Sequence, residues 1–122
     1  MEKEKTTLVL GASLKPERYA NMAIRRLRAH GHPVVAVGLR EGLVGDTPVV
    51  KAIPEGSEVH TVTLYLNASN QAGWEKQLLA LHPQRIIFNP GAENPAFAKV
   101  AEGAGIETME ACTLVLLSTG QF

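Results

Sequence analysis

Cysteine, aromatic side chains and an excess of either charge are all scarce in this 122-residue chain. Because Cys112 is the single cysteine, no internal disulfide can form, and a reducing compartment is the simplest expectation. Lys and Arg together number 12, as do Asp and Glu, so the formal net charge is zero. Proteins that grip nucleic acid usually carry a basic excess. We therefore expect no nucleic-acid partner.

Long apolar runs are also missing. None is long enough to cross a bilayer, and Met1 to Lys5 form a charged lead-in with no apolar signal core. We therefore expect a cytoplasmic protein with no membrane association. The length fits one domain over residues 1–122. Hydrophobic residues at 45% and charged residues at 20% are typical of a globular chain.

Short aliphatic runs alternate with segments of helical period. The runs cover residues 7–10, 34–37, 59–66, 85–88 and, more weakly, 106–109. Apolar stripes with helical spacing cover residues 20–30, 71–81 and 95–104. Continuous aliphatic runs are typical of strands covered on both faces. The alternation predicts an α/β, doubly wound, Rossmann-like fold with a mostly parallel sheet of about five strands and helices on both faces.

Several residues mark the ends of these elements. Gly31 and Gly105 follow two helical stripes, where a helix often ends in a left-handed residue. Asn94 before Pro95 predicts a capped helix start. Residues 38–56 show no strong period, which predicts an irregular segment. Residues 113–117 fit either a last strand or a short buried helix, and we favour the helix because the predicted sheet is already complete.

The first strand runs directly into a turn of small residues. Gly11 and Ala12 let the backbone approach a ligand, and free amides at the following helix start favour an anion. Ser13 offers a hydroxyl, while Lys15 and Arg18 offer positive charge. The turn lacks the second and third glycines of G-x-G-x-x-G. A phosphate site and an ordinary tight turn with solvated basic residues both remain open.

The loop after the second strand bears on the kind of nucleotide. An NAD site places Asp or Glu here to bind the ribose hydroxyls. This chain has Gly38, Leu39 and Arg40, followed by Glu41. An arginine suits the extra ribose phosphate of NADP or coenzyme A, although a plain surface arginine is the alternative. In the loop after residue 88, Asn89 and Glu93 are candidate contacts, whereas Asn94 is better explained as a helix cap.

Residues for catalysis or metal binding do not form a recognisable set. The four histidines fall at helix ends or strand starts, on the edge of the sheet opposite these loops. No Walker lysine motif or G-x-S-x-G elbow is present. We therefore predict no catalytic and no metal-binding residues, and we expect Trp74 to be a core residue.

The order of these segments resembles a known family. The sequence Leu8 to Ser13, followed by Arg18 and Tyr19, resembles the opening of the small stand-alone CoA-binding proteins. Residues 87–91 and the segment around Cys112 match that family as well. The family is similar to the nucleotide-binding domain at the start of the succinyl-CoA synthetase alpha subunit. The resemblance covers nearly the whole chain and implies one CoA-binding Rossmann-like domain over residues 1–122.

The resemblance also implies how coenzyme A would lie. Its phosphates would lie along residues 11–13, with residues 18, 19 and 21 beside them. Residues 38–40 would meet the adenosine end, and residues 65–68 and 89–91 the remainder. Together with Lys15 from the first turn, the candidate cofactor-binding residues are Gly11, Ala12, Ser13, Lys15, Arg18, Tyr19, Asn21, Gly38, Leu39, Arg40, Tyr65, Asn67, Asn89, Pro90 and Gly91.

The synthetase depends on a phosphorylated histidine from a further domain that this chain does not contain. The resemblance therefore implies a protein that binds coenzyme A or an acyl-CoA as a carrier, sensor or subunit rather than an enzyme. A small-molecule nucleotide ligand is expected, and a protein partner is left open. Two alternatives remain. One is an enzyme dependent on NADP or another nucleotide with an unidentified substrate, and the other is an interaction module with a vestigial pocket. Cys112 is either a buried inert thiol or a partner for the thiol of CoA.

Overall fold

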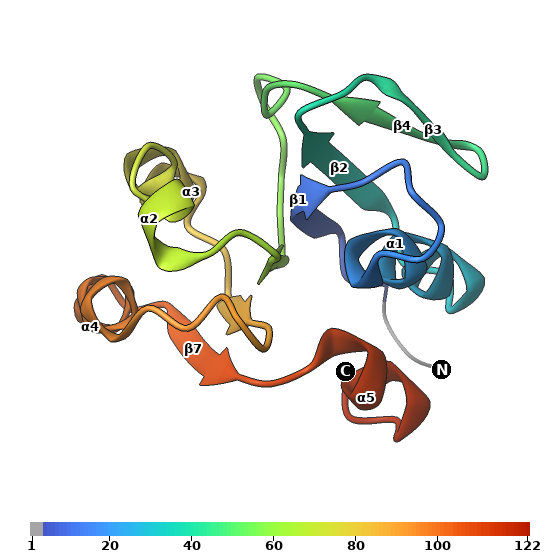
Figure 1. The fold of residues 1–122 in the computed structure, drawn as a ribbon. Coiled ribbons are helices and arrows are strands. Elements are labelled where there is room, and N and C mark those ends of the chain that lie inside the picture. Colours follow the sequence, from blue (N-terminus) through green and yellow to red (C-terminus); the bar gives the residue numbers. More distant parts are fainter. Residues whose placement is uncertain (1–3) are drawn as a thin grey trace.

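A computed structural model describes residues 4–122, so residues 1–3 of the charged lead-in lie outside the described part. Strands and helices alternate along the chain and form one sheet with helices on both faces (Figure 1). The elements are β1 (Thr7–Ala12), α1 (Tyr19–Ala29), β2 (Val34–Gly38), β3 (Gly42–Val44), β4 (Thr47–Val50), β5 (Thr61–Leu64), α2 (Ala68–Gln71), α3 (Glu75–Leu81), β6 (Arg85–Phe88), α4 (Pro95–Gly103), β7 (Glu107–Glu110) and α5 (Thr113–Ser118).

The sheet has seven strands in the order β3-β4-β2-β1-β5-β6-β7. All neighbours are parallel except β3 and β4, which pair antiparallel. The predicted α/β, mostly parallel architecture is confirmed, but the prediction of about five strands is wrong. The two additional strands form a hairpin inside residues 38–56, the segment predicted to be irregular. Three- and four-residue strands are too short to show a clear period in the sequence.

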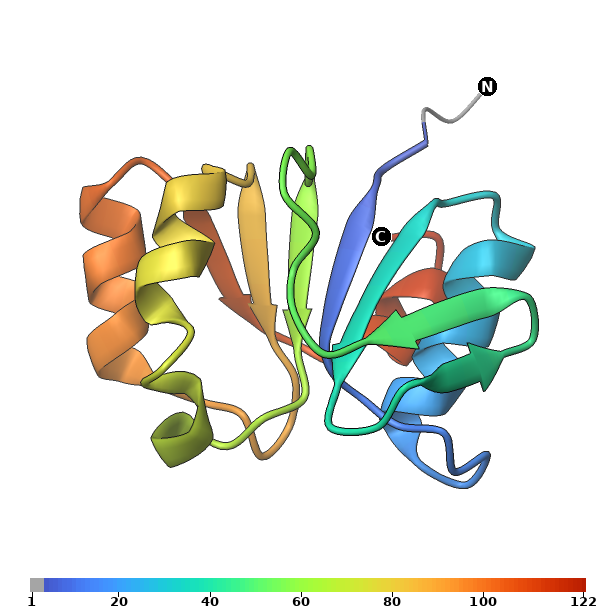
Figure 2. The ribbon, with the colours of Figure 1, turned by 90° about the horizontal axis from the view of Figure 1, so that it is seen from above.

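Strand residues alternate between two apolar clusters, one on each face of the sheet. Leu8 and Leu10 of β1 join the cluster that packs on α3 and α4. Val9 and Ala12 join the opposite cluster, which packs on α1 and α5. Figure 2 shows this division, with α3 and α4 on one side of the strands and α1 and α5 on the other. Successive residues of β1 point to opposite faces, and because both faces are covered by helices, both sets of residues are aliphatic.

The helix ends follow the residues that marked them. Gly31 and Gly105 both have positive φ, +84° and +85°, just beyond α1 and α4. The Asn94 side-chain oxygen accepts a hydrogen bond from the Phe97 amide at 3.2 Å, which confirms the predicted cap. The single helix expected over residues 71–81 is instead two, α2 and α3, separated at residues 72–74. The helix favoured over residues 113–117 is confirmed as α5.

Two further sets of contacts surround the core, one predicted from the sequence and one not. Trp74 packs against the cluster below α3, as expected for a core residue. At the amino-terminal edge of the sheet, Lys5 Nζ and Arg85 Nη2 both donate hydrogen bonds to the main-chain oxygen of Phe122, at 2.6 and 2.8 Å. The Arg85 guanidinium lies 4.4 Å from the centre of the Phe122 ring. These contacts fix the segment after α5 against β6.

The chain order creates a switch point beside β1. From β1 the chain passes to β2 over the α1 face, and later returns to β5 on the other side of β1. The connections that follow β1 and β5 therefore leave toward opposite faces of the sheet, at the lower edge in Figure 2, where the loops after the parallel strands gather. In open parallel sheets this is the usual position of a ligand. Within residues 4–122, no helix is long and apolar enough to cross a membrane.

Candidate functional site

The turn after β1 depends on a glycine with a left-handed backbone. Gly11 has φ +96°, a conformation that side chains rarely adopt. A Cβ built on Gly11 would lie 3.0 Å from the carbonyl carbon of Tyr65, the residue that follows β5. The amide of Tyr65 donates to the carbonyl oxygen of Leu10 at 2.9 Å. The two strand ends of the switch point are thus in close backbone contact.

The helix that follows presents an uncapped amino terminus. Arg18 is the capping residue of α1, and its side chain makes no capping hydrogen bond. The first turn of α1 contains no acidic residue. The amides of this turn therefore keep their capacity to donate to an anion, and the helix dipole favours negative charge there. Lys15, Arg18 and Tyr19 are exposed around this terminus.

Two of the predicted site residues shape this turn from within. The Ser13 hydroxyl oxygen accepts a hydrogen bond from the Lys15 amide at 3.2 Å. Asn21 is 3% exposed, and its Nδ2 donates to the carbonyl oxygen of Ser13 at 2.9 Å. Its Oδ1 accepts from Arg25 Nε at 2.8 Å. Asn21 therefore holds the turn in place, so any part it has in binding is indirect.

The end of β2 lies directly against the end of β1. The pairing of β1 with β2 is irregular between Leu10 and Ala12, and Ala12 faces Gly38. A Cβ on Gly38 would lie only 2.3 Å from the carbonyl oxygen of Ala12, so no other residue fits without a backbone shift. Leu39 is 91% exposed and Arg40 is exposed. Both side chains follow β2 at the carboxyl edge, as predicted.

Asn89 joins three elements. Its Nδ2 donates to the Thr63 hydroxyl at 2.6 Å and to the Leu64 carbonyl at 2.9 Å. Its Oδ1 accepts from the Thr113 amide at 2.8 Å, at the start of α5. Both amide hydrogens are thus used, and the residue is 2% exposed. The contacts tie the end of β6 to β5 and α5, so Asn89 lies at the predicted edge with its donors turned inward.

The remaining predicted residues lie on the same edge in exposed loops. Asn67 Oδ1 accepts from the Asn70 amide at 2.9 Å and so caps the short helix α2. Pro90 and Gly91 are exposed, and Gly91 has φ +93°. The Gly91 amide donates to the Glu93 carboxylate at 3.0 Å. Glu93 therefore closes this turn.

Sequence reasoning missed the residue that joins two of these loops. Gln71 is fully buried, and its Nε2 donates to the carbonyl oxygens of Leu66 and Ala92, at 2.8 and 2.7 Å. Its Oε1 accepts from Asn94 Nδ2 at 2.9 Å. This buried network clamps the loop after β5 to the loop after β6. In the sequence, Gln71 was one polar residue within an apolar stripe, and nothing else marked it.

Tyr65 occupies the switch point itself. Burial raises the pKa of its phenol to about 12, and the nearby Cys112 adds to the rise. The Thr113 and Thr63 hydroxyls act in the opposite direction, but burial prevails. Tyr65 is therefore a neutral hydrogen-bond donor at physiological pH.

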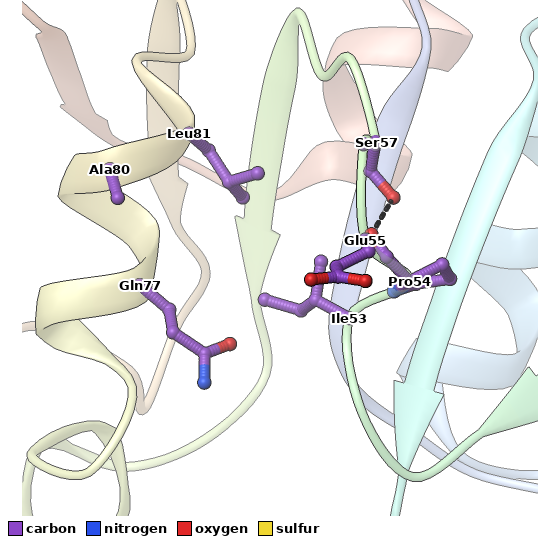
Figure 3. A pocket seen from close by; sticks show the side chains of 8 residues that line it. Ile53, Pro54, Glu55, Ser57, Gln77, Ala80 and Leu81 are labelled. Atoms are coloured by element: carbon purple, nitrogen blue, oxygen red, sulfur yellow. Dashed lines mark hydrogen bonds between the residues drawn. The ribbon is translucent and has the colours of Figure 1, made fainter.

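Two surface cavities lie away from these residues. One, of about 350 Å³, lies between the connection from β4 to β5 and helix α3, where Gln77 and Leu81 face Ile53 and Glu55 (Figure 3). The other, of about 520 Å³, lies between α4 and β7 and includes Lys99 and Glu110. Neither is lined by any of the predicted cofactor-binding residues.

The geometry at the carboxyl edge fits a phosphate-bearing group. A small-residue turn without side-chain bulk at Gly11 leads to an uncapped helix terminus. Exposed Lys15, Arg18 and Arg40 add positive charge. These are the elements from which anion sites are built in α/β proteins. Within residues 4–122, no group of three or more His, Cys, Asp or Glu is placed to hold a metal ion.

Comparisons with known proteins agree with this fold. The chain is similar to a crystal structure of an uncharacterized protein, with 42% identity, a TM-score of 0.94 and coverage of 99% of this chain and 100% of that one. It is also similar to a protein of Thermus thermophilus, with 30% identity, a TM-score of 0.83 and coverage of 98% and 91%. A hypothetical protein from Pyrococcus horikoshii OT3 shares the fold at 22% identity, with a TM-score of 0.86 and coverage of 96% and 84%.

No curated protein matches the chain significantly. A model of the CoA-binding domain family does match, over residues 5–118. That match spans every strand and helix described above. Family membership supports the binding of coenzyme A in general. The chain shares its Rossmann-like fold with the uncharacterized protein that is 42% identical to it, and it belongs to the CoA-binding domain family.

Proposed function

We propose that the chain binds coenzyme A or an acyl-CoA at the carboxyl edge of the sheet and acts as a non-catalytic carrier, sensor or subunit. The observation that carries the proposal is the turn from Gly11 to the uncapped start of α1. There a left-handed glycine at the end of β1 is followed by free helix amides and two exposed cations, Lys15 and Arg18. Each of these features favours a phosphate group.

Three groups of residues then divide the ligand between them. The backbone of residues 11–13 and the first turn of α1 bind the pyrophosphate, with Lys15 and Arg18 neutralising its charge. The loop of residues 38–40 meets the adenosine, and Arg40 pairs with the 3′-phosphate. Exposed residues of the loops after β5 and β6, including Asn67, Pro90 and Gly91, border the pantetheine. Asn21 acts by holding the turn after β1, and Asn89 acts by holding the end of β6 against α5.

A non-catalytic role is supported by where the histidines lie. The four histidines of the chain lie at helix ends or strand starts, on the amino-terminal side of the sheet. Of these, His60 bonds to Thr61 and His30 to the carbonyl oxygen of Arg26. A general base must lie within hydrogen-bond reach of the reacting group. A histidine at the opposite edge does not meet that requirement.

A nucleotide-dependent enzyme is the second candidate, because Arg40 also suits the 2′-phosphate of NADP. The two functions differ in ligand preference. We expect CoA to raise the melting temperature more than NADP, NAD or ATP, and dephospho-CoA to have a smaller effect because it lacks the phosphate assigned to Arg40. At 100 times the dissociation constant, a ligand adds about 2.7 kcal/mol of stability.

A thermal-shift panel with these ligands therefore tests the proposal. Arg40→Ala serves as the matched variant, and it should remove most of the difference between CoA and dephospho-CoA. Equal or greater stabilisation by NAD or NADP would replace the CoA proposal with the enzyme. A flat response to every ligand would favour an interaction module with a vestigial pocket.

A further inference from the structure

The hydroxyl of Tyr65 is buried and makes no hydrogen bond. Among residues 4–122, it is the one fully buried side-chain nitrogen or oxygen atom without a partner. Its neighbours include the Thr63 and Thr113 hydroxyls, which bond to each other at 2.7 Å. Asn89 Nδ2 donates to the same Thr63 oxygen at 2.6 Å. These groups bond to one another, and the phenol lies beside the two threonine hydroxyls without a hydrogen bond of acceptable geometry.

A buried hydroxyl without a partner is unfavourable, because it has lost its hydrogen bonds to water. Phenylalanine would fill the same apolar space between the sheet and α5 without that cost. Nothing in the packing of the unliganded chain therefore explains why the residue is tyrosine. A role for the hydroxyl in a second state of the molecule would explain it.

The position of Tyr65 indicates what that second state is. Its main chain is fixed at the switch point by the hydrogen bond to Leu10 and by the close approach of Gly11. The side chain is only partly buried, so its ring borders the surface at this edge. Rotation of the side chain about this fixed backbone would carry the hydroxyl from the interior toward the turn of residues 11–13.

Building on the proposed CoA site, we propose that Tyr65 is a ligand-responsive residue. When the pyrophosphate occupies the turn after β1, the phenol leaves its buried position beside Thr63 and Thr113 and donates a hydrogen bond to a phosphate oxygen. Binding then gives the hydroxyl the partner that it lacks in the free protein. The contacts of Asn89 with Thr63 and Thr113 stay intact, so the space that the phenol leaves keeps its shape.

Calorimetric titration of the full chain and its Tyr65→Phe variant tests this role. We expect Tyr65→Phe to weaken CoA binding about five- to tenfold, the usual effect of losing one hydrogen bond. Binding of adenosine 3′-monophosphate, which has no pyrophosphate, should be unchanged. The melting temperature of the free variant should be unchanged or higher, because the unpaired hydroxyl is gone. Ser57→Ala, which removes a hydroxyl bonded to Pro54 near the other edge, should leave CoA binding as in the wild type.

A label on the tyrosine rings reports the movement directly. The chain has two tyrosines, so Tyr65→Phe identifies the Tyr65 signal in a ¹³C spectrum. That signal should shift on addition of CoA. Equal CoA affinity in the variant would overturn the role of the hydroxyl but not the proposed CoA binding. Loss of affinity for both CoA and adenosine 3′-monophosphate, together with a lower melting temperature, would do the same. Failure of the wild type to bind CoA at all would overturn the proposed function with it.

Discussion

The Cα of Gly38 faces the carbonyl oxygen of Ala12 so closely that a Cβ would lie 2.3 Å from it. The contact joins the ends of β1 and β2 at the edge assigned to the ligand. Backbone atoms cannot yield as a flexible side chain can. The irregular pairing of β1 with β2 at this position therefore requires glycine, although Gly38 was predicted only as a ligand neighbour.

Gly38→Ala should accordingly lower the free energy of unfolding by about 1–3 kcal/mol or more, as forced overpacking does. Urea denaturation of the variant and the wild type measures the difference. Gly103→Ala is the matched control, because a Cβ there meets nothing within 4 Å. That control, at the end of α4, should be neutral or stabilising. A Gly38→Ala variant as stable as the wild type would show that the two strand ends can separate freely.

Asn89 should prove to be a residue of the fold. Asn89→Ala would leave the Thr113 amide without its partner and remove the side-chain hydrogen bonds to Thr63 and to the Leu64 carbonyl, and we expect a loss of about 2–4 kcal/mol in unfolding free energy. Asn70→Ala, an exposed amide on α2, should cost far less. The opposite pattern, full stability with loss of CoA binding, would mean that Asn89 contacts the ligand directly.

Arg18, unlike Asn89, should affect ligand binding rather than stability. Its side chain is exposed and does not cap α1, so Arg18→Ala should leave the melting temperature of the free protein nearly unchanged. If it pairs with phosphate, the variant should bind CoA about tenfold more weakly. Arg26→Ala, on the last turn of the same helix, controls for the loss of one positive charge. Equal weakening in both variants would point to net charge rather than a contact.

We expect His60 to make the fold sensitive to acid. Burial, followed by the positive charges of Arg85, Lys5 and His32, lowers the pKa of His60 from 6.5. The unfolded chain therefore takes up the proton first, and stability should fall as the pH drops through and below 6.5. His60→Gln should reduce the loss of stability between pH 7.5 and pH 5, measured by urea denaturation. His30→Gln, at an exposed position, should retain the wild-type loss. A variant at position 60 that follows the wild type at both pH values would contradict the assignment.

The long aliphatic strands and the main helical stripes could be predicted because each carries its own signal. Val9 and Leu10 are buried on opposite faces, and a continuous apolar run is the mark of such a strand. The β3–β4 hairpin was missed although Gly45 and Asp46 form a two-residue turn that often joins hairpin strands. Its strands are short, and Pro48 in β4 lacks the amide that strands normally use.

The edge that carries the candidate site could also be predicted, because loops after parallel strands always meet at one edge. The role of each side chain could not. Asn89 and Asn21 were both predicted to contact a ligand, yet their amides are used by Thr113 and Ser13, which the folded chain brings near. Sequence position gives proximity to a site, whereas the use of each donor and acceptor depends on three-dimensional neighbours.

The position of bound CoA tests the central claim most directly. An amide ¹H–¹⁵N spectrum of the labelled chain, titrated with CoA to saturation, locates the ligand residue by residue. We expect the largest shifts at the amides of residues 11–13 and the first turn of α1, with smaller shifts at residues 38–40. Residues 53–57 and α3, which line the cavity of Figure 3, should change little. Shifts confined to that cavity, or no shifts at millimolar CoA, would contradict the account.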